Sequence, residues 1–490
     1  MTATELRRSS RSGAVGLLGA AVNGAFGFVL TTVVVRTFGA AGSGELFSVI
    51  GLVTIAGAVC CAGADTALMW ALPRRPADGG RLLPVALLPT AAVSLAVGVL
   101  GFAGAAPLGR VLDGDPALLR LAFAGVPVIV MSTVLLAAVR ATRPVGSYVA
   151  VQLVFVPVAR PALMVGSVAL GGGVLLGFAA WLLPLAVAAA IAAMLLAGPL
   201  TRPLARPLAR PEPADWRLFW SFALPRAASV AIDASSMWVG VLLTGALATQ
   251  AEAGVFAAAG RYALAGLLIM QGLRVAVAPQ LSRLLGADRR AEAAQVYRRT
   301  TLWIVVLSWP AYLLLAAFAP AFLALFGAQF AGGTAPLVVL AAAMLVNVGV
   351  GLVQTVLLMS GNSRAHLLAT VAGLALNVLA AAVLIPRHGA LGAAIAWSLG
   401  IVAENVLAAV FARRALGAAL GSTTLARAAA AVVAATGSAA LIGVLAAGRG
   451  LGGLAIALSL LAAGCLGSLL DRRVRAALST VLSNVRREAR

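Results

Sequence analysis

The chain has 490 residues, of which 62% are hydrophobic and only 10% are charged, and its formal net charge at pH 7 is +21. One soluble core cannot bury so much apolar material, so a soluble protein is excluded. In a membrane protein the basic excess indicates loops that face anionic lipid headgroups, rather than nucleic-acid binding. The composition predicts an all-α polytopic membrane protein that contacts anionic lipids and no nucleic acid.

Apolar segments long enough to cross a bilayer recur along the chain and predict about 14 transmembrane helices. The first seven are expected near residues 13–35, 44–64, 82–104, 118–139, 146–170, 174–197 and 218–247. The second seven are expected near residues 253–277, 302–321, 335–359, 367–385, 390–411, 428–447 and 451–470.

Arginine is distributed unevenly between the predicted loops. Most loop arginines lie on one side of the membrane, and the loops of the other side carry only Arg36, Arg110, Arg387 and Arg449. The positive-inside rule makes the arginine-rich side cytoplasmic. We therefore expect a multi-pass protein with both termini in the cytoplasm.

A proline- and arginine-rich segment divides the predicted helices into groups. The expected parts are an N-terminal lobe (1–200), a cytoplasmic linker (201–217), a C-terminal lobe (218–412), two further helices (413–470) and a basic amphipathic tail (471–490). Residues 283–301 and the tail are expected to lie flat on the cytoplasmic leaflet, the tail most simply as an anchor. A weak repeat, Gly44-Glu45-Leu46-Phe47 against Ala253-Gly254-Val255-Phe256, supports two lobes of six helices.

The residues needed for enzymatic or metal chemistry are scarce. Two histidines, His366 and His388, lie at span ends, and the cysteines Cys60, Cys61 and Cys465 have no metal-ligand spacing. The predicted outer loops are too short to build a catalytic domain. We expect a protein that is not an enzyme and needs no metal or cofactor.

Charged side chains inside predicted spans are costly in a bilayer and usually mark a transport pathway. The informative ones are Arg160, Arg226, Arg261, Asp233 and Glu404. Arg226 and Asp233 are seven residues apart and share one helical face, so an ion pair with neighbouring helices explains them equally well. Arg160 and Arg226 each adjoin a proline, which bends a helix and frees backbone carbonyls.

Glu404, beside Asn405, is the deepest carboxylate of the second lobe and a candidate for proton or cation coupling, although a buried neutral glutamate would look the same. Asp65 and Arg274 are expected near cytoplasmic span ends, where either can be simply interfacial.

Five stretches, at residues 27–40, 63–66, 278–284, 325–327 and 377–394, carry a family pattern. They include Gly27-Phe28-Val29, Arg36-Thr37-Phe38-Gly39-Ala40 and Ile385-Pro386-Arg387-His388-Gly389. Together they resemble the multidrug/oligosaccharidyl-lipid/polysaccharide (MOP) exporter superfamily, and within it the polysaccharide-biosynthesis flippase branch. The resemblance implies two six-helix lobes around a cavity, two further helices, and alternating access that carries a lipid-linked glycan outward across the plasma (inner) membrane of a bacterium.

The expected substrate is an undecaprenyl-diphosphate-linked oligosaccharide. Lipid II flippases have Arg-Asp after the Gly-Phe-Val of span one, where this chain has Leu30 and Thr31, while their later arginine corresponds to Arg36. Drug exporters of the superfamily favour acidic cavities, whereas deep arginines suit an anionic diphosphate. The expected substrate-binding residues are Arg160, Arg226, Arg261, Arg36 and Arg274, and the expected ion-coupling residues are Asp233, Glu404 and Asp65.

Alternatives to this function are a multidrug or lipid II exporter, a binding-only scaffold, and, less favoured, a membrane sugar polymerase or ligase. Glycan polymerases or glycosyltransferases of the same pathway are candidate partners.

Overall fold

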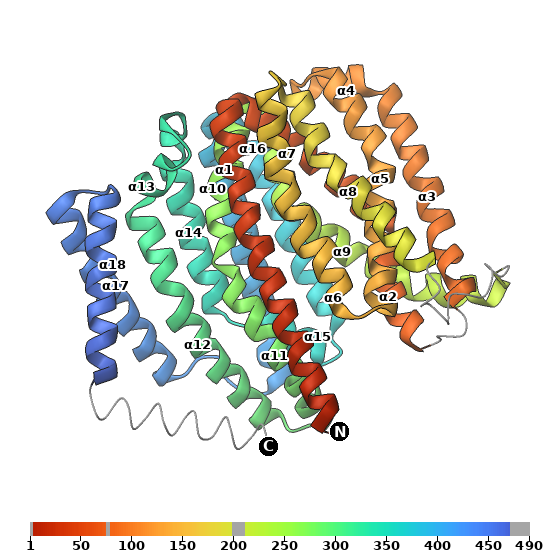
Figure 1. Cartoon of the computed structure of the whole chain (residues 1–490). Helices are drawn as coiled ribbons and strands as arrows, with labels where there is room; N and C mark the ends of the chain where they lie inside the picture. Colours follow the sequence, from red (N-terminus) through yellow and green to blue (C-terminus); the bar gives the residue numbers. More distant parts are fainter. Residues whose placement is uncertain (1–2, 75–78, 198–210, 471–490) are drawn as a thin grey trace.

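The computed structural model describes residues 3–74, 79–197 and 211–470 and places them in helices and short connections, with no strand among them (Figure 1). The helices of the first half are α1 (Ala3–Cys61), α2 (Ala64–Arg74), α3 (Gly79–Ala103), α4 (Ala105–Leu112), α5 (Pro116–Thr142), α6 (Val145–Tyr148), the π-helical turn η2 (Val149–Phe155), α7 (Val156–Ala169) and α8 (Val174–Ala197). The helices of the second half are α9 (Pro213–Leu247), α10 (Gln250–Ala265), α11 (Leu267–Gly286), α12 (Arg290–Ala317), α13 (Ala319–Ala324), the 3-10 turn η3 (Ala328–Gly333), α14 (Thr334–Gly349), α15 (Val353–Met359), α16 (Ser363–Leu416), α17 (Thr423–Ala447) and α18 (Leu451–Leu470).

These helices confirm the prediction of an all-α polytopic membrane protein. Within the described residues, 9 helices are long and apolar enough to cross a membrane, and the bent pair of α10 and α11 raises this to 10. Two of the nine, α1 and α16, each contain two helices joined at a break. In α9 and α18 the apolar stretches that the structure describes are shorter, Ser235–Leu247 and Leu451–Leu466. In chain order these elements follow the positions of the predicted spans.

Glycines make the breaks inside α1 and α16. Gly39 has φ 69° and Gly389 has φ 50°, in the left-handed region that residues with a Cβ atom avoid. After Gly389 the backbone N–H of Ala390 donates a hydrogen bond of 2.7 Å to Oε2 of Glu252, which caps the restarted helix from α10. Each break therefore joins two predicted spans with almost no loop.

Two predicted spans are themselves broken. The span at residues 253–277 bends by 43° between α10 and α11, next to Gly266. The span at residues 335–359 is interrupted between α14 and α15 at Gly351, which has φ 65°. A Cβ atom on Gly351 would lie 2.1 Å from Oγ1 of Thr301, so the close packing of α12 requires glycine here.

Two segments that the sequence places in the cytoplasm differ from expectation. Residues 290–301 do not lie flat but begin α12, which continues as one helix to Ala317. The reason is packing, because Ala293, Ala294 and Tyr297 are buried in a cluster with residues of α15 and α16. The last part of the predicted linker is helical, since α9 begins at Pro213 with a capping box. The tail 471–490 and residues 201–210 lie outside the described residues.

The predicted repeat marks a contact between the two halves. Gly44 of α1 faces α10 so closely that a Cβ atom on it would lie 1.6 Å from the carbonyl oxygen of Gln250. A Cβ atom on Gly254 would likewise lie 2.2 Å from the carbonyl oxygen of Ala40. Small residues permit such close approach of membrane helices. The two matching segments thus pack against each other, whereas α17 packs on α12 and on α18 (Figure 1).

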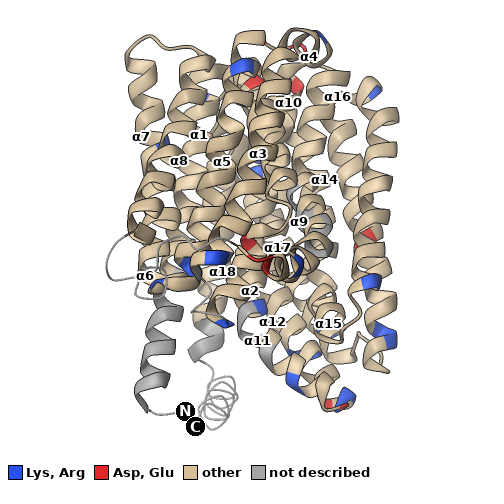
Figure 2. Ribbon diagram, turned by 90° about the vertical axis from the view of Figure 1, so that its right-hand side faces the viewer, with Lys and Arg blue, Asp and Glu red and all other residues tan. Residues whose placement is uncertain are grey.

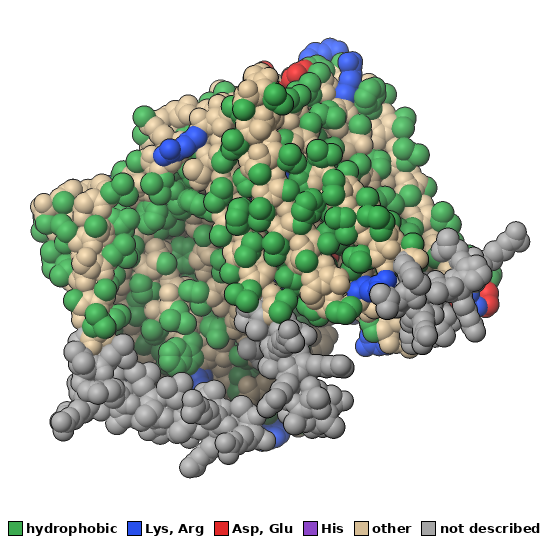
Figure 3. Space-filling view, viewed as in Figure 1, with side chains coloured by type: hydrophobic (Ala, Val, Ile, Leu, Met, Phe, Trp, Pro, Cys, Tyr) green, Lys and Arg blue, Asp and Glu red, His purple; other side chains and the backbone are tan. Residues whose placement is uncertain are grey.

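Positions of charged residues are few along the middle of the ribbon and more frequent toward its two ends (Figure 2). Between the ends, hydrophobic side chains cover most of the visible flank (Figure 3). Large apolar side chains are exposed at the surface of the molecule. Among them are Leu100, which is 72% exposed, and Leu379, which is 68% exposed. Such an apolar belt fits the hydrocarbon core of a bilayer. We call the two ends the α4 end and the α2 end, after helices at opposite ends in Figure 1.

Candidate functional site

A cavity of about 280 Å³ lies between α1, α7 and the bend that joins α10 to α11. Its wall on α1 includes Gly27 and Phe28, which belong to the stretch that carries the family pattern. The charged side chains that line it are Arg160 from α7 and Arg261 from α10. No carboxylate occurs in its described lining, so we call it the arginine cavity.

Arg160 is fixed in orientation by the neighbouring helix α8. Its Nε donates a hydrogen bond of 3.2 Å to the carbonyl oxygen of Trp181, and its Cζ lies 4.1 Å from the centroid of the Trp181 ring. The planar guanidinium stacks well on an indole ring and keeps further N–H donors available. Pro157 and Pro161 flank this position in α7. Arg160 can therefore offer directed donors to an anion in the arginine cavity.

Arg261 lies between two cavities. Besides the arginine cavity, it lines a smaller one of about 110 Å³ together with Phe47 of α1 and Trp238 of α9. The described lining of this second cavity also contains no carboxylate. Because a buried cation needs compensation in a low-dielectric region, these two cavities form an electropositive volume that favours an anion. Arg160 comes from the first half of the chain and Arg261 from the second.

A separate cavity of about 220 Å³ lies in the second half and contains Glu404 and Arg274. Oε1 of Glu404 accepts hydrogen bonds from Nε2 of Gln354 at 2.8 Å and from Oγ1 of Thr370 at 3.1 Å. On the next residue, Nδ2 of Asn405 donates a bond of 3.0 Å to Oδ1 of Asn347. We call this polar site the Glu404 cavity.

The other predicted site residues are dispersed. Arg36 is exposed, and its Nε donates a bond of 2.9 Å to the carbonyl oxygen of Leu325, so it links α1 to the end of α13. Asp65 lines a fourth cavity, beside α5. Arg226 and Asp233 lie on α9, but their side chains are outside the described residues. The structure thus brings Arg160 together with Arg261, and Glu404 together with Arg274, in different cavities.

Sequence reasoning missed several partners of these charges. Trp181 supplies a ring face and a backbone carbonyl to Arg160, and nothing in an apolar span distinguishes it from a lipid-facing tryptophan. Gln354 and Asn347 are seven residues apart, a spacing that helical periodicity puts on one face, yet Gln354 bonds Glu404 of α16 and Asn347 bonds Asn405. Periodicity finds residues on one helix face but not their partners on another helix.

These features define an all-helical membrane protein with an arginine-lined cavity between segments from its two halves. No protein-family model matches the sequence, and no curated protein matches it. Solved structures do match its fold. The lipid II flippase MurJ in an inward closed conformation matches with a TM-score of 0.71 and 10% identity, over 90% of this chain and 97% of that chain.

Two further matches are transporters. An inward-facing multidrug resistance transporter of the MATE family, in the MOP superfamily, matches with a TM-score of 0.67 and 15% identity, over 80% of this chain and 94% of that chain. A MOP superfamily transporter from Pyrococcus furiosus matches with a TM-score of 0.62 and 16% identity, over 84% and 95% of the two chains. The chain therefore has the fold of MOP superfamily transporters, and its place in the polysaccharide branch stays a prediction.

Proposed function

We propose that the protein is a flippase that moves an undecaprenyl-diphosphate-linked oligosaccharide, or a related polysaccharide precursor, from the cytoplasmic to the outer leaflet. The observation that carries this proposal is the pairing of Arg160 and Arg261 in one cavity whose described lining has no carboxylate. A diphosphate crossing the bilayer needs such compensating cations, and guanidinium groups bind its oxygens in directed pairs.

Alternating access follows from where the two arginines lie. Arg160 belongs to the first half and Arg261 to the second, so a relative movement of the halves changes the distance between them and the shape of the anion site. The likeness to structures described as inward-facing and as inward closed supports a fold that adopts more than one state. The positive-inside rule favours the plasma membrane with both termini cytoplasmic.

Glu404 is the proposed coupling group. Its carboxylate lies in the Glu404 cavity, apart from the two arginines, so proton or cation uptake there need not neutralise the diphosphate site. Protonation or cation binding would change the hydrogen bond with Gln354, which connects α15 to α16, and the bond with Thr370, which joins the two parts of α16 on either side of Gly389. Such a change can favour one arrangement of the second half over another.

Lipid II is a second candidate substrate, because the fold also matches a lipid II flippase and because both substrates carry a diphosphate. The sequence favours the oligosaccharide, since Leu30 and Thr31 replace the charged pair of that branch. Leu30 lines the arginine cavity, so the difference falls at the proposed site.

A binding assay tests the proposal directly. Tryptophan fluorescence of the purified full chain should respond to undecaprenyl diphosphate, because Trp181 contacts Arg160, and should respond far less to undecaprenol or to a cationic dye. Transport of lipid-linked oligosaccharide and of lipid II by proteoliposomes then decides between the two substrates. Tighter binding of the cationic dye than of the diphosphate would overturn the proposal and favour a drug exporter.

A further inference from the structure

We propose that the first half of the chain binds a monovalent cation in a cavity between α2, α5 and η2, with Asp65 as the charged ligand. This cavity measures about 120 Å³ and shares no lining residue with the arginine cavity or the Glu404 cavity. Asp65 enters it from α2, Ser132 from α5 and Gln152 from η2.

Three oxygen atoms that line this cavity are buried and have no hydrogen-bond partner. They are Oδ1 of Asp65, Oγ of Ser132 and Oε1 of Gln152. Ser132 is only 1% exposed, so water outside the protein cannot satisfy its hydroxyl. Unpaired buried polar atoms are rare because each costs free energy, and three at one cavity indicate a bound species that they share.

The chemistry of these atoms selects a hard cation. Carboxylate, hydroxyl and amide-carbonyl oxygens are ligands that alkali and alkaline-earth ions prefer. The single carboxylate carries too little charge for a divalent ion, especially because the guanidinium of Arg140 lines the same cavity. Arg140 stacks on Tyr148, with Cζ 5.1 Å from the ring centroid, and no ion pair between it and Asp65 is present among the described contacts. A monovalent ion fits this balance.

The backbone departs from regular helix geometry next to two of the proposed ligands, Asp65 and Gln152. Ala62 and Gly63 have positive φ values of 45° and 75°. Helix α1 therefore ends at Cys61, and α2 begins at Ala64, one residue before Asp65. A Cβ atom on Gly63 would lie 2.4 Å from the carbonyl oxygen of Ala223. Gln152 lies in the π-helical turn η2. Broken helices and π-turns are frequent at ion and ligand sites in membranes.

Cation binding is independent of the proposed substrate, whereas any role of this cation in driving transport rests on the proposed function. The test therefore uses no lipid substrate. The thermal unfolding temperature of the purified full chain is measured in detergent with increasing NaCl or KCl, and choline chloride keeps the ionic strength constant. We expect a saturable rise in unfolding temperature with at least one of the two alkali ions.

Variants locate the site. Asp65→Asn and Ser132→Ala should raise the half-saturating concentration at least about tenfold. Arg140→Gln should lower it, because it removes an opposing charge. Two variants serve as matched controls. Asp113→Asn changes an exposed aspartate, and Ser167→Ala changes a buried serine whose hydroxyl already donates to the carbonyl oxygen of Met164. Both controls should respond to the ion as the parent does.

Several results would overturn the inference. A folded parent protein with no saturable response to either ion would show that water alone fills the cavity. If the unfolding temperature of Asp65→Asn rises with the ion as that of the parent does, the cation binds elsewhere. The same conclusion follows if only Glu404→Gln abolishes the rise. If Asp65→Asn does not fold, Arg140→Gln decides, because a site at Asp65 requires tighter binding in that variant. None of these results depends on which lipid the protein carries.

Discussion

Arg160 shows how one side chain is prepared for an anion by its neighbours. The Trp181 ring covers one face of its guanidinium, and the Trp181 carbonyl fixes its Nε, so the group keeps its orientation without an acidic partner. A lysine at this position would keep the charge but lose the planar stacking and the directed pair of donors. At the residue scale, orientation therefore matters as much as charge.

Arg160→Lys should weaken binding of undecaprenyl diphosphate about tenfold, which corresponds to about 1.4 kcal/mol, and Arg160→Ala should weaken it further. Titration of the fluorescence change measures both. Arg120→Gln is the matched control, because Arg120 is an exposed arginine near Phe102, away from the arginine cavity. Equal affinity in Arg160→Ala and the parent would remove Arg160 from the substrate site.

Glu404→Gln should abolish the dependence of transport on a proton gradient while leaving the protein folded. The amide can still accept the bonds from Gln354 and Thr370, so the unfolding free energy should change by less than about 1 kcal/mol. Transport by proteoliposomes with and without an imposed gradient is the measurement. Glu292→Gln, at an exposed ion pair of α12, is the control. A variant that keeps full gradient dependence would exclude Glu404 from coupling.

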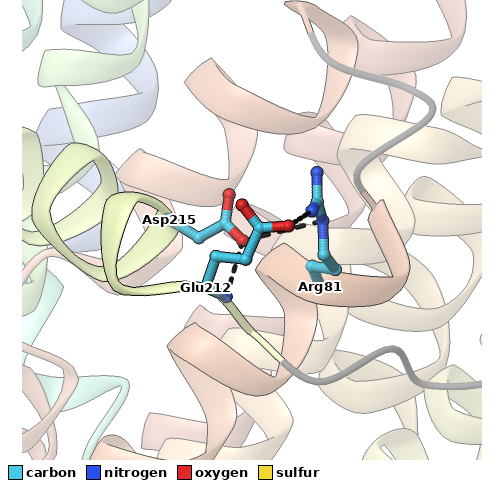
Figure 4. A network of polar contacts seen from close by, with 3 residues as sticks. All are labelled: Arg81, Glu212 and Asp215. Carbon is cyan, nitrogen blue, oxygen red and sulfur yellow. Dashed lines mark hydrogen bonds and ion pairs between the residues drawn. The ribbon is translucent and has the colours of Figure 1, made fainter.

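At the scale of elements, a cluster of three charges joins α3 of the first half to the start of α9 in the second (Figure 4). Nη1 of Arg81 donates to Oε1 of Glu212, and its Nε lies 3.6 Å from Oδ2 of Asp215. Asp215 also accepts a bond of 3.0 Å from the backbone N–H of Glu212, so the same carboxylate caps α9. The cluster therefore connects the halves at a helix start.

Arg81→Ala should release this connection and change the transport rate more than the stability. Glu212 is largely exposed, so the pair contributes under about 1 kcal/mol and weakens with added salt. Unfolding temperature and transport rate are measured at low and high salt. Arg289→Ala breaks an exposed pair within one helix and serves as the control. A transport rate equal to that of the control would show that the cluster only caps α9.

At the scale of the whole molecule, the arginine distribution predicts the orientation in the membrane. A single cysteine added after Arg490 should be protected from an impermeant maleimide in intact cells, whereas one replacing Asp113 should be labelled. The background protein has its native cysteines replaced by serine. Labelling in lysed cells controls for reactivity. The opposite pattern would invert the orientation, and with it the proposed direction of transport.

The sequence by itself determined the fold class and the positions of the spans, because the cost of placing polar backbone in lipid imposes long apolar helices. It also singled out Arg160 and Arg261, which line one cavity, and the repeat at residues 44–47 and 253–256. It misjudged residues 290–301, since a stripe of Ala293, Ala294 and Tyr297 suits a protein surface as well as a lipid surface.

Only the tertiary structure decided which charges share a cavity. Arg160 and Arg261 are far apart in the chain, and the packing of α1, α7 and α10 brings them to one cavity. Arg36 of α1 lies outside this cavity and bonds Leu325 instead. The three unpaired oxygens of Asp65, Ser132 and Gln152 also come from separate helices. Helix periodicity places a side chain on one face, but the neighbour opposite that face depends on how the helices pack.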